Sequence, residues 1–434
     1  LIDNIKAVLG DRDLDYIVIN HMEPDHGASL EEVLIRWPNA KVVSTDKAFT
    51  MMKQFGFEIG ERGISVKEGD SLSFGRHNVT FASAAMVHWP EVMVTFDTTD
   101  GILFSADAFG SFGALDGKLF NDEVDFDRDW IDDARRYYTN IVGKYGSFVQ
   151  KLLKKAQSLD IKIICPLHGP VWRSNIGYFV DKHDKWSRYE PEEKGVLIAY
   201  ASMYGNTETA AQALASKLAE RGCLNYRVYD VSNTHVSTLI AESFKYSNIV
   251  LASVTYNMGI FPVMHDFLED MKALCLTGRK FSVIENGTWA PKSGTLITDF
   301  INNDLKSMEI IGNKFGTPNP IPFRVVDHNI GMDIDVSVRC NGVYSYRIVD
   351  PLLFYANVED EYTRQEIDGQ LKTEFISALQ PAFAKISELE IRPNAIPGHV
   401  EELSEAMNES LTTKWSELRG LAVVSIAMNS VTLT

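Results

Sequence analysis

A short run of histidine and acidic residues near the start of the chain has the composition of a metal site. Residues 21–26 read His-Met-Glu-Pro-Asp-His, so four side chains with nitrogen or oxygen donors fall within six positions. Zinc sites favour His and Cys, whereas several carboxylates beside His suit iron or manganese. The alternative for so short a run is a polar turn that binds no metal. Further ligands are needed to choose between the two.

Three more candidate ligands follow, each beside an apolar run that predicts a strand. They are His88 after 79–87, Asp107 after 101–106, and His168 within 163–170. The run 14–20, which precedes the first cluster, is rich in β-branched residues and also predicts a strand. Strand ends are where α/β folds position functional side chains. Four strand ends that close on His or Asp favour a metal site over four unrelated polar turns.

The order of these residues resembles the metallo-β-lactamase-like domain of flavodiiron proteins. Hydrolytic zinc members of that superfamily carry His where Glu23 stands, so the resemblance implies a di-iron centre. A bridging carboxylate suits two nearby cations because it screens their repulsion. His26 fits the motif either as a ligand or as a residue that supports one. The implied ligands, which would also be the catalytic residues, are His21, Glu23 and His88 for one iron, Asp25 and His168 for the other, and Asp107 as the bridge.

A second site is indicated where a strand leads through a Gly-containing loop into a helix. The strand at 195–200 is followed by Ser-Met-Tyr-Gly-Asn-Thr at 202–207 and by an Ala-rich helix at 208–220. Backbone N–H groups and the helix dipole bind phosphate at such a position. The loop has no Lys, unlike nucleoside-triphosphate loops, and lacks the Gly-x-Gly-x-x-Gly spacing of dinucleotide folds. It therefore suits a single phosphomonoester.

This loop resembles the phosphate loop of flavodoxin, which implies FMN as the cofactor. The next two strand ends would hold the isoalloxazine ring, because doubly wound sheets bind ligands at the carboxyl ends of their strands. For Tyr256 and Trp289, packing in the core is the alternative to stacking on the flavin. The implied binding residues are Ser202, Met203, Tyr204, Gly205, Asn206 and Thr207 for the phosphate, Ser253, Thr255, Tyr256 and Asn257 for one side of the ring, and Asn286, Gly287, Thr288 and Trp289 for the other.

These patterns predict three domains in the 434 residues. Residues 1–192 would form an αββα metallo-β-lactamase-like sandwich, and 195–314 a flavodoxin-like, doubly wound parallel sheet. Proline-rich sequence at 315–323 marks a break. Residues 315–434 resemble an α+β band-7 or SPFH domain of the virion-core-like type. Its expected elements are a hairpin of 333–340 with 342–349, helices at 360–388 and 401–418, and a closing strand at 421–431.

The resemblance to flavodiiron proteins begins partway into the first domain, so the family's first strands are expected to be missing. The flavodoxin-like module is expected to lack part of its last strand and its final helix. We therefore expect a chimeric junction near 314/315, with a natural fusion as the alternative.

The charge, the cysteine content and the apolar runs of the sequence exclude some classes of binding partner and cellular location. The net charge of −17 disfavours nucleic acid and anionic membranes, because both need clustered Lys or Arg. The four Cys are scattered without a Cys-x-x-Cys pair, which predicts a reducing cytoplasm and no rubredoxin-type iron site. No apolar run approaches the roughly 20 residues that span a bilayer, and no signal peptide is expected.

The resemblance implies a flavodiiron oxidoreductase that reduces O2 to water or NO to N2O, with FMN passing electrons to the di-iron site. It also implies a head-to-tail homodimer. The electron donor would be separate, either a rubredoxin-like protein or a reduced flavin or deazaflavin system. Two alternatives stay open: a zinc hydrolase with an attached flavodoxin-like module, and a non-catalytic SPFH-type scaffold.

Overall fold

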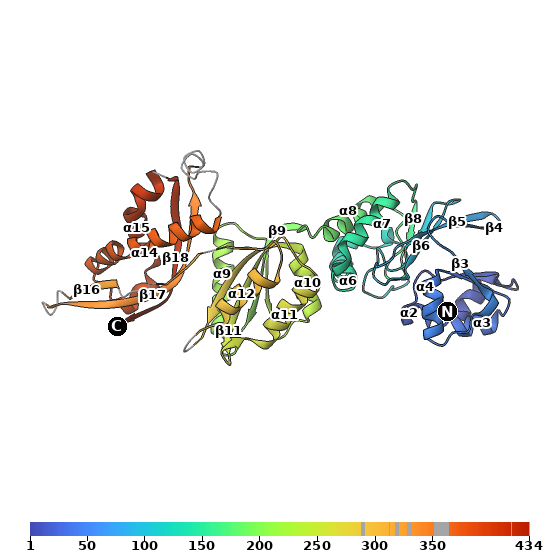
Figure 1. The fold of residues 1–434 in the computed structure, drawn as a ribbon, viewed down its shortest axis with the longest axis horizontal. Helices are drawn as coiled ribbons and strands as arrows, with labels where there is room; N and C mark the ends of the chain where they lie inside the picture. Colours follow the sequence, from blue (N-terminus) through green and yellow to red (C-terminus); the bar gives the residue numbers. More distant parts are fainter. Residues whose placement is uncertain are drawn as a thin grey trace. The chain divides into compact units, whose positions relative to one another are not determined.

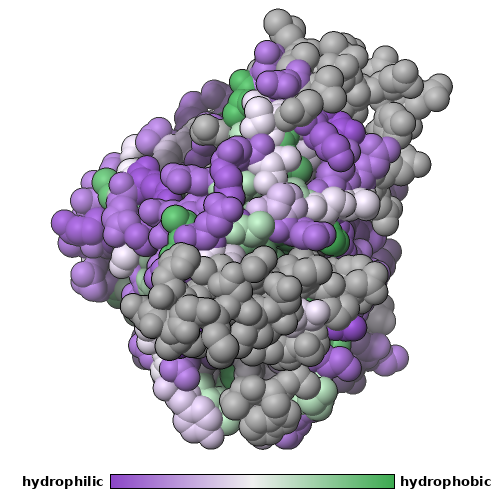
Figure 2. Space-filling model, turned by 90° about the vertical axis from the view of Figure 1, so that its left-hand side faces the viewer, coloured by the Kyte–Doolittle hydropathy of each residue, from purple (hydrophilic) through white to green (hydrophobic). Residues whose placement is uncertain are grey.

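The computed structural model describes residues 1–287, 291–311, 313–316, 321–327, 332–350, 364–417 and 419–433. The chain divides into two compact units, Leu1–Glu309 and Ile310–Thr434 (Figure 1). On the face drawn in Figure 2, hydrophobic residues are scattered among hydrophilic ones in the coloured part of the surface. None of the helices in the described part of the chain has the length and apolar composition that a bilayer-spanning helix needs.

The first unit begins with a three-stranded parallel sheet and the helices that cover it. The strands pair in the order β1 (Tyr16–Val18), β2 (Lys41–Ser44) and β3 (Gly63–Ser65). The helical segments are α1 (Ile2–Leu9), α3 (Leu30–Arg36), α4 (Asp46–Gln54) and the 3-10 turn η1 (Gly60–Arg62). Helix α3 buries Leu30, Val33 and Leu34 in one cluster with Val42 of β2, which is the i, i+3, i+4 face of an amphipathic helix.

A second, five-stranded sheet follows in the order β4 (Ser71–Phe74), β5 (His77–Ser83), β6 (Met93–Asp97), β7 (Ile102–Phe104) and β8 (Ile163–Cys165). Neighbouring strands are antiparallel except β7 and β8, which are parallel and are joined by a long helical crossover. The helical segments here are η2 (Asn121–Glu123), α5 (Phe126–Asp129), α6 (Ile131–Tyr137), the π-helix η3 (Tyr138–Val142), η4 (Gly143–Tyr145), α7 (Gly146–Ala156) and α8 (Ile176–Ser187).

Apolar side chains join these layers. Val43 of the first sheet packs with Val79 and Phe81 of the second, so the two sheets face each other. On the other face of the second sheet, Ile164 shares a cluster with Leu152 of α7, among other residues. The layers therefore run helix, sheet, sheet, helix, which confirms the predicted αββα sandwich.

The rest of the first unit is a doubly wound sheet, in the order β10 (Tyr226–Asp230), β9 (Glu193–Ala201), β11 (Tyr246–Tyr256), β13 (Lys280–Asn286) and β14 (Glu309–Ile310), with the short β12 (Gly259–Ile260) beside β11. In chain order this is 2-1-3-4-5, the flavodoxin order, and the pairings from β10 to β13 are parallel. Its helices are α9 (Asn206–Glu220), α10 (Val236–Lys245), α11 (Pro262–Ala273) and α12 (Ser293–Asp304).

The second unit is an antiparallel sheet with helices packed on it, as expected for the α+β segment. Strand β17 (Met332–Ile348) pairs with β15 (Asn313–Gly316), β16 (Ile321–Asp327) and β18 (Leu421–Leu433). The helical segments are α14 (Arg364–Glu388), η5 (Pro393–Gly398), α15 (Val400–Leu411) and the π-helix η6 (Thr412–Glu417). Helix α14 lies within the helix predicted at 360–388 and buries one apolar stripe formed by Leu371, Phe375, Leu379 and Phe383.

The predicted hairpin of 333–340 with 342–349 is wrong. The two segments form one continuous strand, β17, because each finds a different neighbour: the first half pairs with β16 and the second half with β15 and β18. The register shifts between Asn341 and Gly342, so Gly342 accommodates an irregularity in the ladder where we expected a turn.

Candidate metal centre and flavin pocket

The first four candidate ligands lie in the loop that follows β1 and in the short helix α2 (Pro24–Gly27). Asn20 anchors this loop to the second sheet, because its amide donates to the Phe104 carbonyl at 3.3 Å and accepts from the Thr95 hydroxyl at 2.7 Å. Met22 is fully buried beneath it. The loop is therefore held at the same end of the sandwich as the loops after β5, β7 and β8.

One group of donors is formed by His21, Glu23, His88 and Asp107, whose ligand atoms all lie within 4.8 Å of one another. Glu23 Oε2 lies 3.2 Å from His21 Nε2 and 3.0 Å from His88 Nε2. Asp107 Oδ2 lies 3.2 Å from His88 Nε2 and 3.6 Å from His21 Nε2. Two imidazole nitrogens and two carboxylate oxygens thus converge on one point.

A second group is formed by Asp25, His26 and His168. Asp25 Oδ2 lies 3.5 Å from His26 Nε2 and 3.3 Å from His168 Nε2. The other oxygen of Asp107, Oδ1, lies 3.0 Å from His26 Nε2 and 3.7 Å from His168 Nε2. Asp107 therefore presents one oxygen to each group, and the structure brings all seven predicted metal-site residues together.

The electrostatics fit a site for cations. Burial opposes ionisation of Asp107, yet a hydrogen bond from His88 and the charges of His21 and His26 hold its pKa far below the usual range. For His26 and His88, burial disfavours the proton, but the nearby carboxylates prevail and raise both pKa values. His26 Nε2 and Asp107 Oδ1 are buried without a hydrogen-bond partner among the described residues. A cation between them would satisfy both atoms, and the mixed donor set suits iron.

His88 reaches this site from a loop, which corrects one prediction. Strand β5 ends at Ser83, and His88 stands five residues later in the turn before β6. The apolar run 79–87 continues past the strand because Ala84 and Val87 are buried in the outer core as part of the turn. Met86, two residues before His88, and Ala106, directly before Asp107, have positive φ angles of 68° and 51°, a strain that often marks functional loops.

Sequence reasoning missed Glu91, which is buried and holds His21 in place. Its Oε1 accepts from His21 Nδ1 at 2.7 Å and from the Met22 backbone N–H at 3.0 Å. Burial opposes its ionisation, but these two hydrogen bonds lower its pKa. Because His21 Nδ1 donates its proton to Glu91, Nε2 is left free to bind a cation. The only signal in the sequence is its place directly after the Trp-Pro pair that follows His88.

Sequence reasoning also missed Tyr137, at the end of α6. Burial first, and the charge of Asp107 second, raise the pKa of its phenol. Its ring lies 5.4 Å from that of His168. A Cβ atom on Gly110 would come within 2.7 Å of the Tyr137 ring, so only glycine permits this approach. The acidic and aromatic segment 122–138 therefore also contributes to the site.

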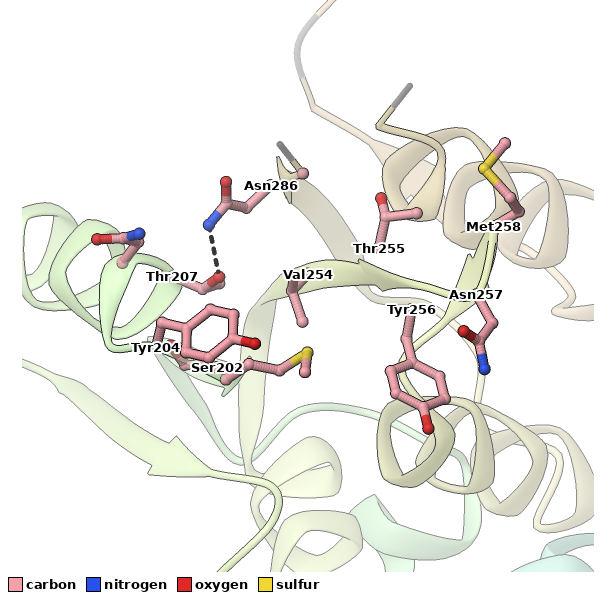
Figure 3. Close-up of a pocket in the computed structure, with 12 residues that line it drawn as sticks. Ser202, Tyr204, Thr207, Val254, Thr255, Tyr256, Asn257, Met258 and Asn286 are labelled. Atoms are coloured by element: carbon pink, nitrogen blue, oxygen red, sulfur yellow. Dashed lines mark hydrogen bonds between the residues drawn. The ribbon is translucent and has the colours of Figure 1, made fainter. Parts of the chain in front are cut away.

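The predicted flavin residues surround an open pocket of about 530 Å³ at the carboxyl ends of β9, β11 and β13 (Figure 3). Gly205 and Ser253 are not among the residues that line it, and Val254 and Met258 are additions. Thr288 and Trp289 lie outside the described residues. The lining residues are Ser202, Met203, Tyr204, Asn206, Thr207, Val254, Thr255, Tyr256, Asn257, Met258, Asn286 and Gly287.

The phosphate loop is shaped by local hydrogen bonds. Gly205, just before α9, has φ 84°, a conformation that glycine adopts without strain. Its N–H donates to Ser202 Oγ at 3.1 Å. Thr207 Oγ1 accepts from the Asn286 amide at 3.1 Å, which joins the loop after β9 to that after β13 (Figure 3). Ser253 is instead fully buried within β11.

Comparisons with known proteins assign these parts to families. Residues 1–169 match the ODP family of beta-lactamases, 198–300 match flavodoxin, and 300–434 match the SPFH domain-Band 7 family. The nitric oxide reductase of Moorella thermoacetica is 33% identical over 276 residues, which cover 63% of this chain and 68% of that protein. The anaerobic nitric oxide reductase flavorubredoxin of Vibrio vulnificus is 30% identical over 292 residues, 66% of this chain and 58% of that protein.

Comparison with solved structures agrees with these family assignments. The rubredoxin oxygen:oxidoreductase of Desulfovibrio gigas has 26% identity and a TM-score of 0.66, and covers 71% of this chain and 77% of its own. The flavodiiron protein of Giardia intestinalis has 25% identity and the same TM-score and coverage. Sandwich, doubly wound sheet and converging ligands together define a two-site metal and flavin protein. The chain belongs to the flavodiiron protein family, whose members carry a di-iron centre and FMN.

Proposed function

We propose that the chain is an oxidoreductase that reduces NO to N2O, O2 to water, or both. The observation that carries this proposal is the position of Asp107, which offers one carboxylate oxygen to each of two donor groups. The names of the Moorella and Desulfovibrio relatives, a nitric oxide reductase and an oxygen oxidoreductase, support the reaction class.

His21, Glu23 and His88 would hold one iron, and Asp107 would be shared between the two irons. The second iron is assigned to Asp25 and His168, and the 3.0 Å separation of His26 Nε2 from Asp107 Oδ1 supports His26 as a further ligand. Two iron ions held by these residues would supply two electrons, the number that two NO molecules need to become N2O, and reduction of O2 to water would need two more from the flavin. Glu91 keeps the free nitrogen of His21 aimed at the first group, and the burial of Asp107 excludes water from the side that faces the helices.

For the flavin, the phosphate would lie against the backbone of 202–207 at the start of α9, where the helix dipole favours an anion. FMN accepts electrons in pairs and releases them singly. Tyr256 is 39% exposed and stands at the pocket rim, where its ring can cover the flavin. Thr255 Oγ1 accepts from the backbone N–H groups of Lys292 and Ser293, which holds the rim of the pocket in shape.

The partners follow from the same assignment. Each site is built from its own part of the chain, the metal groups from 21–168 and the pocket from 202–287. A head-to-tail homodimer, in which the flavin of one subunit serves the metal centre of its partner, would connect them. A separate donor, a rubredoxin-like protein or a reduced flavin or deazaflavin system, would reduce the FMN. The four cysteines are free thiols, which supports a cytoplasmic location.

The test is anaerobic purification of the full chain, with iron, zinc and FMN measured per chain and NO and O2 consumption followed with a reduced donor. We expect two iron ions, one FMN and turnover of at least one of the gases. The substitution His88→Ala should abolish turnover and leave FMN bound. Two zinc ions without iron would refute the proposal in favour of a hydrolase.

A further inference from the structure

A small cavity lined by buried residues lies directly behind the metal centre, between the second sheet and the outer helices. It measures about 10 Å³, room for a single molecule of the size of water or a diatomic gas. One end reaches Asp107 and Val87, the neighbour of His88. The walls come from the loop after β7, the end of α6, the π-helix η3, α7 and α8. The lining residues are Val87, Asp107, Ala108, Phe109, Tyr137, Tyr138, Val142, Val149, Leu152, Leu153 and His183.

The wall carries no charge apart from Asp107. His183 is the one other titratable group of the wall that could be charged near neutral pH, and burial lowers its pKa to about 4. Its Nδ1 donates to the Phe179 carbonyl at 3.0 Å, so the ring is held as a neutral tautomer. The other side chains of the wall are aliphatic or aromatic, and all of them are buried. An ion would be destabilised here, and a neutral, weakly polar molecule would not.

The backbone around the cavity is irregular where it meets the wall. Tyr138 and Val142 belong to the π-helix η3, a wide turn that is rare and often marks functional sites. Phe109, two residues after Asp107, has φ 66°. The cavity is therefore bordered by two irregular backbone segments of the kind that cluster at functional sites.

Water is the competing occupant. The hydroxyls of Tyr137 and Tyr138 are buried without a hydrogen-bond partner within the described residues. A buried water, however, commonly makes about three hydrogen bonds. Asp107 Oδ1 is a third unpaired atom, but it lies 3.0 Å from His26 Nε2 in the second donor group, where a bound cation would use it. The seven apolar side chains of the wall give a gas molecule dispersion contacts and offer water no hydrogen bonds.

We propose that this cavity is a docking niche for the neutral diatomic substrate, NO or O2, on its way to the metal centre. This inference rests on the proposed function for the identity of the gas. The niche would raise the local concentration of a gas beside Asp107 while the apolar wall keeps ions and bulk water out.

Xenon is the probe, because it enters small apolar cavities without needing iron or turnover. Crystals of the full-length holoenzyme under xenon pressure should show a xenon atom among Val142, Val149 and Leu152. The substitution Val149→Phe, which fills the cavity from α7, should remove that peak. Val149→Ala, which enlarges it, should keep it. An ordered water bonded to the Tyr137 and Tyr138 hydroxyls, with no xenon, would overturn the proposal.

Kinetics provide the second readout. Val149→Phe should raise KM for NO and for O2 by roughly tenfold with kcat little changed, since a binding step is lost and the chemical step is kept. Val33→Phe, the same change in the core of the first sheet's helix layer, is the matched control and should leave KM as it is. Both gases are measured because the niche is expected to serve each gas that the enzyme reduces.

An unchanged KM for both gases in a folded, iron-loaded Val149→Phe enzyme would overturn the niche while leaving the proposed function intact. Conversely, a wild-type enzyme that binds xenon here yet reduces neither gas would refute the proposed function and not the cavity. The two failures are therefore distinguishable.

Discussion

The metal centre and the flavin pocket belong to the same unit but are built from different parts of the polypeptide. At the metal centre, charged side chains from four separate loops converge, and Asp107 at the middle is 1% exposed. At the flavin pocket, loop backbone and a helix start form the surface, and the side chains on the rim are open to solvent: Tyr204 is 85% exposed and Met258 50%.

Because the two sites are built differently, we expect them to differ in their sensitivity to substitutions and to pH. Carboxylates and imidazoles packed within hydrogen-bonding distance balance one another's charge, so the loss of one changes the pKa and position of the rest. A phosphate held by backbone N–H groups and a helix dipole loses little when one side chain is shortened. The metal centre should therefore respond sharply to single substitutions and to pH, and the flavin pocket only weakly.

The largest expected effect comes from Asp107→Ala. Both donor groups lose their shared carboxylate, so iron at both positions and all gas reduction should be lost, while FMN per chain stays at the wild-type level. Iron analysis and flavin absorbance on the same sample test this. Asp107→Asn keeps the shape without the charge and serves as the control for folding. Normal iron content in a folded Asp107→Ala protein would show that Asp107 is not the bridge.

A smaller loss is expected for Glu91→Ala, which removes the acceptor of the His21 Nδ1–H without touching a ligand. Substitutions of this kind typically lower metal affinity about 10–100-fold. The iron affinity of Glu91→Gln should lie between those of Glu91→Ala and the wild type, because an amide oxygen can still accept from His21 and from the Met22 N–H. Glu68→Gln changes an exposed carboxylate paired with Lys155 and should have no effect on iron binding. Competition with a chelator measures all three.

The fold could be predicted from the sequence where the spacing of apolar residues and the residue types both indicate the same kind of element. The run 163–165 and the stripe from Leu371 to Phe383 are apolar with the spacing of a strand and of a helix, and both form as expected. The ligands were predictable because each follows such a run and because metal chemistry restricts residue types. The predicted hairpin at 333–349 was wrong because alternating polar and apolar residues predict a strand but do not identify the strand that pairs with it. Pairing with the distant strands β16 and β18 made this segment one continuous strand without a turn.

Glu91, Tyr137 and the apolar cavity were not predictable from sequence. The sequence does not distinguish a buried Glu from an exposed one, and only the packing of the folded chain buries Glu91, at 2% exposure, beside His21. Tyr137 lies in a segment of mixed charge whose outer face is solvated, and its role depends on Gly110 on another loop. Contacts between residues far apart in sequence carry no local pattern, so they appear only once the sandwich is assembled.

The effect of pH should separate the two sites further. In the metal-free chain the pKa values of His26 and His88 are raised, against the effect of burial, by Asp107 and its neighbouring carboxylates. Iron must displace these protons, so its apparent affinity should rise as the pH increases above about 6.5. The same raised pKa values stabilise the metal-free fold below about 6.5 and lose that contribution at higher pH.

Metal-free protein should consequently melt at a lower temperature at high pH than at about pH 6, and iron titrations should show tighter binding at high pH. FMN affinity should change little from about pH 7 to 9, since no His, Lys or acid is among the described residues that line the pocket. Equal pH dependence at both sites would contradict the contrast between them. Calorimetry of the metal-free chain and fluorescence titration of FMN provide the measurements.

The smallest effect is expected at the flavin pocket itself, for Thr207→Ala. This change removes the hydroxyl that accepts from the Asn286 amide and leaves the backbone of the phosphate loop in place. A single hydrogen bond contributes about 1 kcal/mol, so FMN affinity should fall about fivefold, with iron content unchanged. Thr207→Ser keeps the hydroxyl and should bind FMN as the wild type does. Complete loss of FMN from Thr207→Ala would mean that side chains, and not backbone, hold the cofactor.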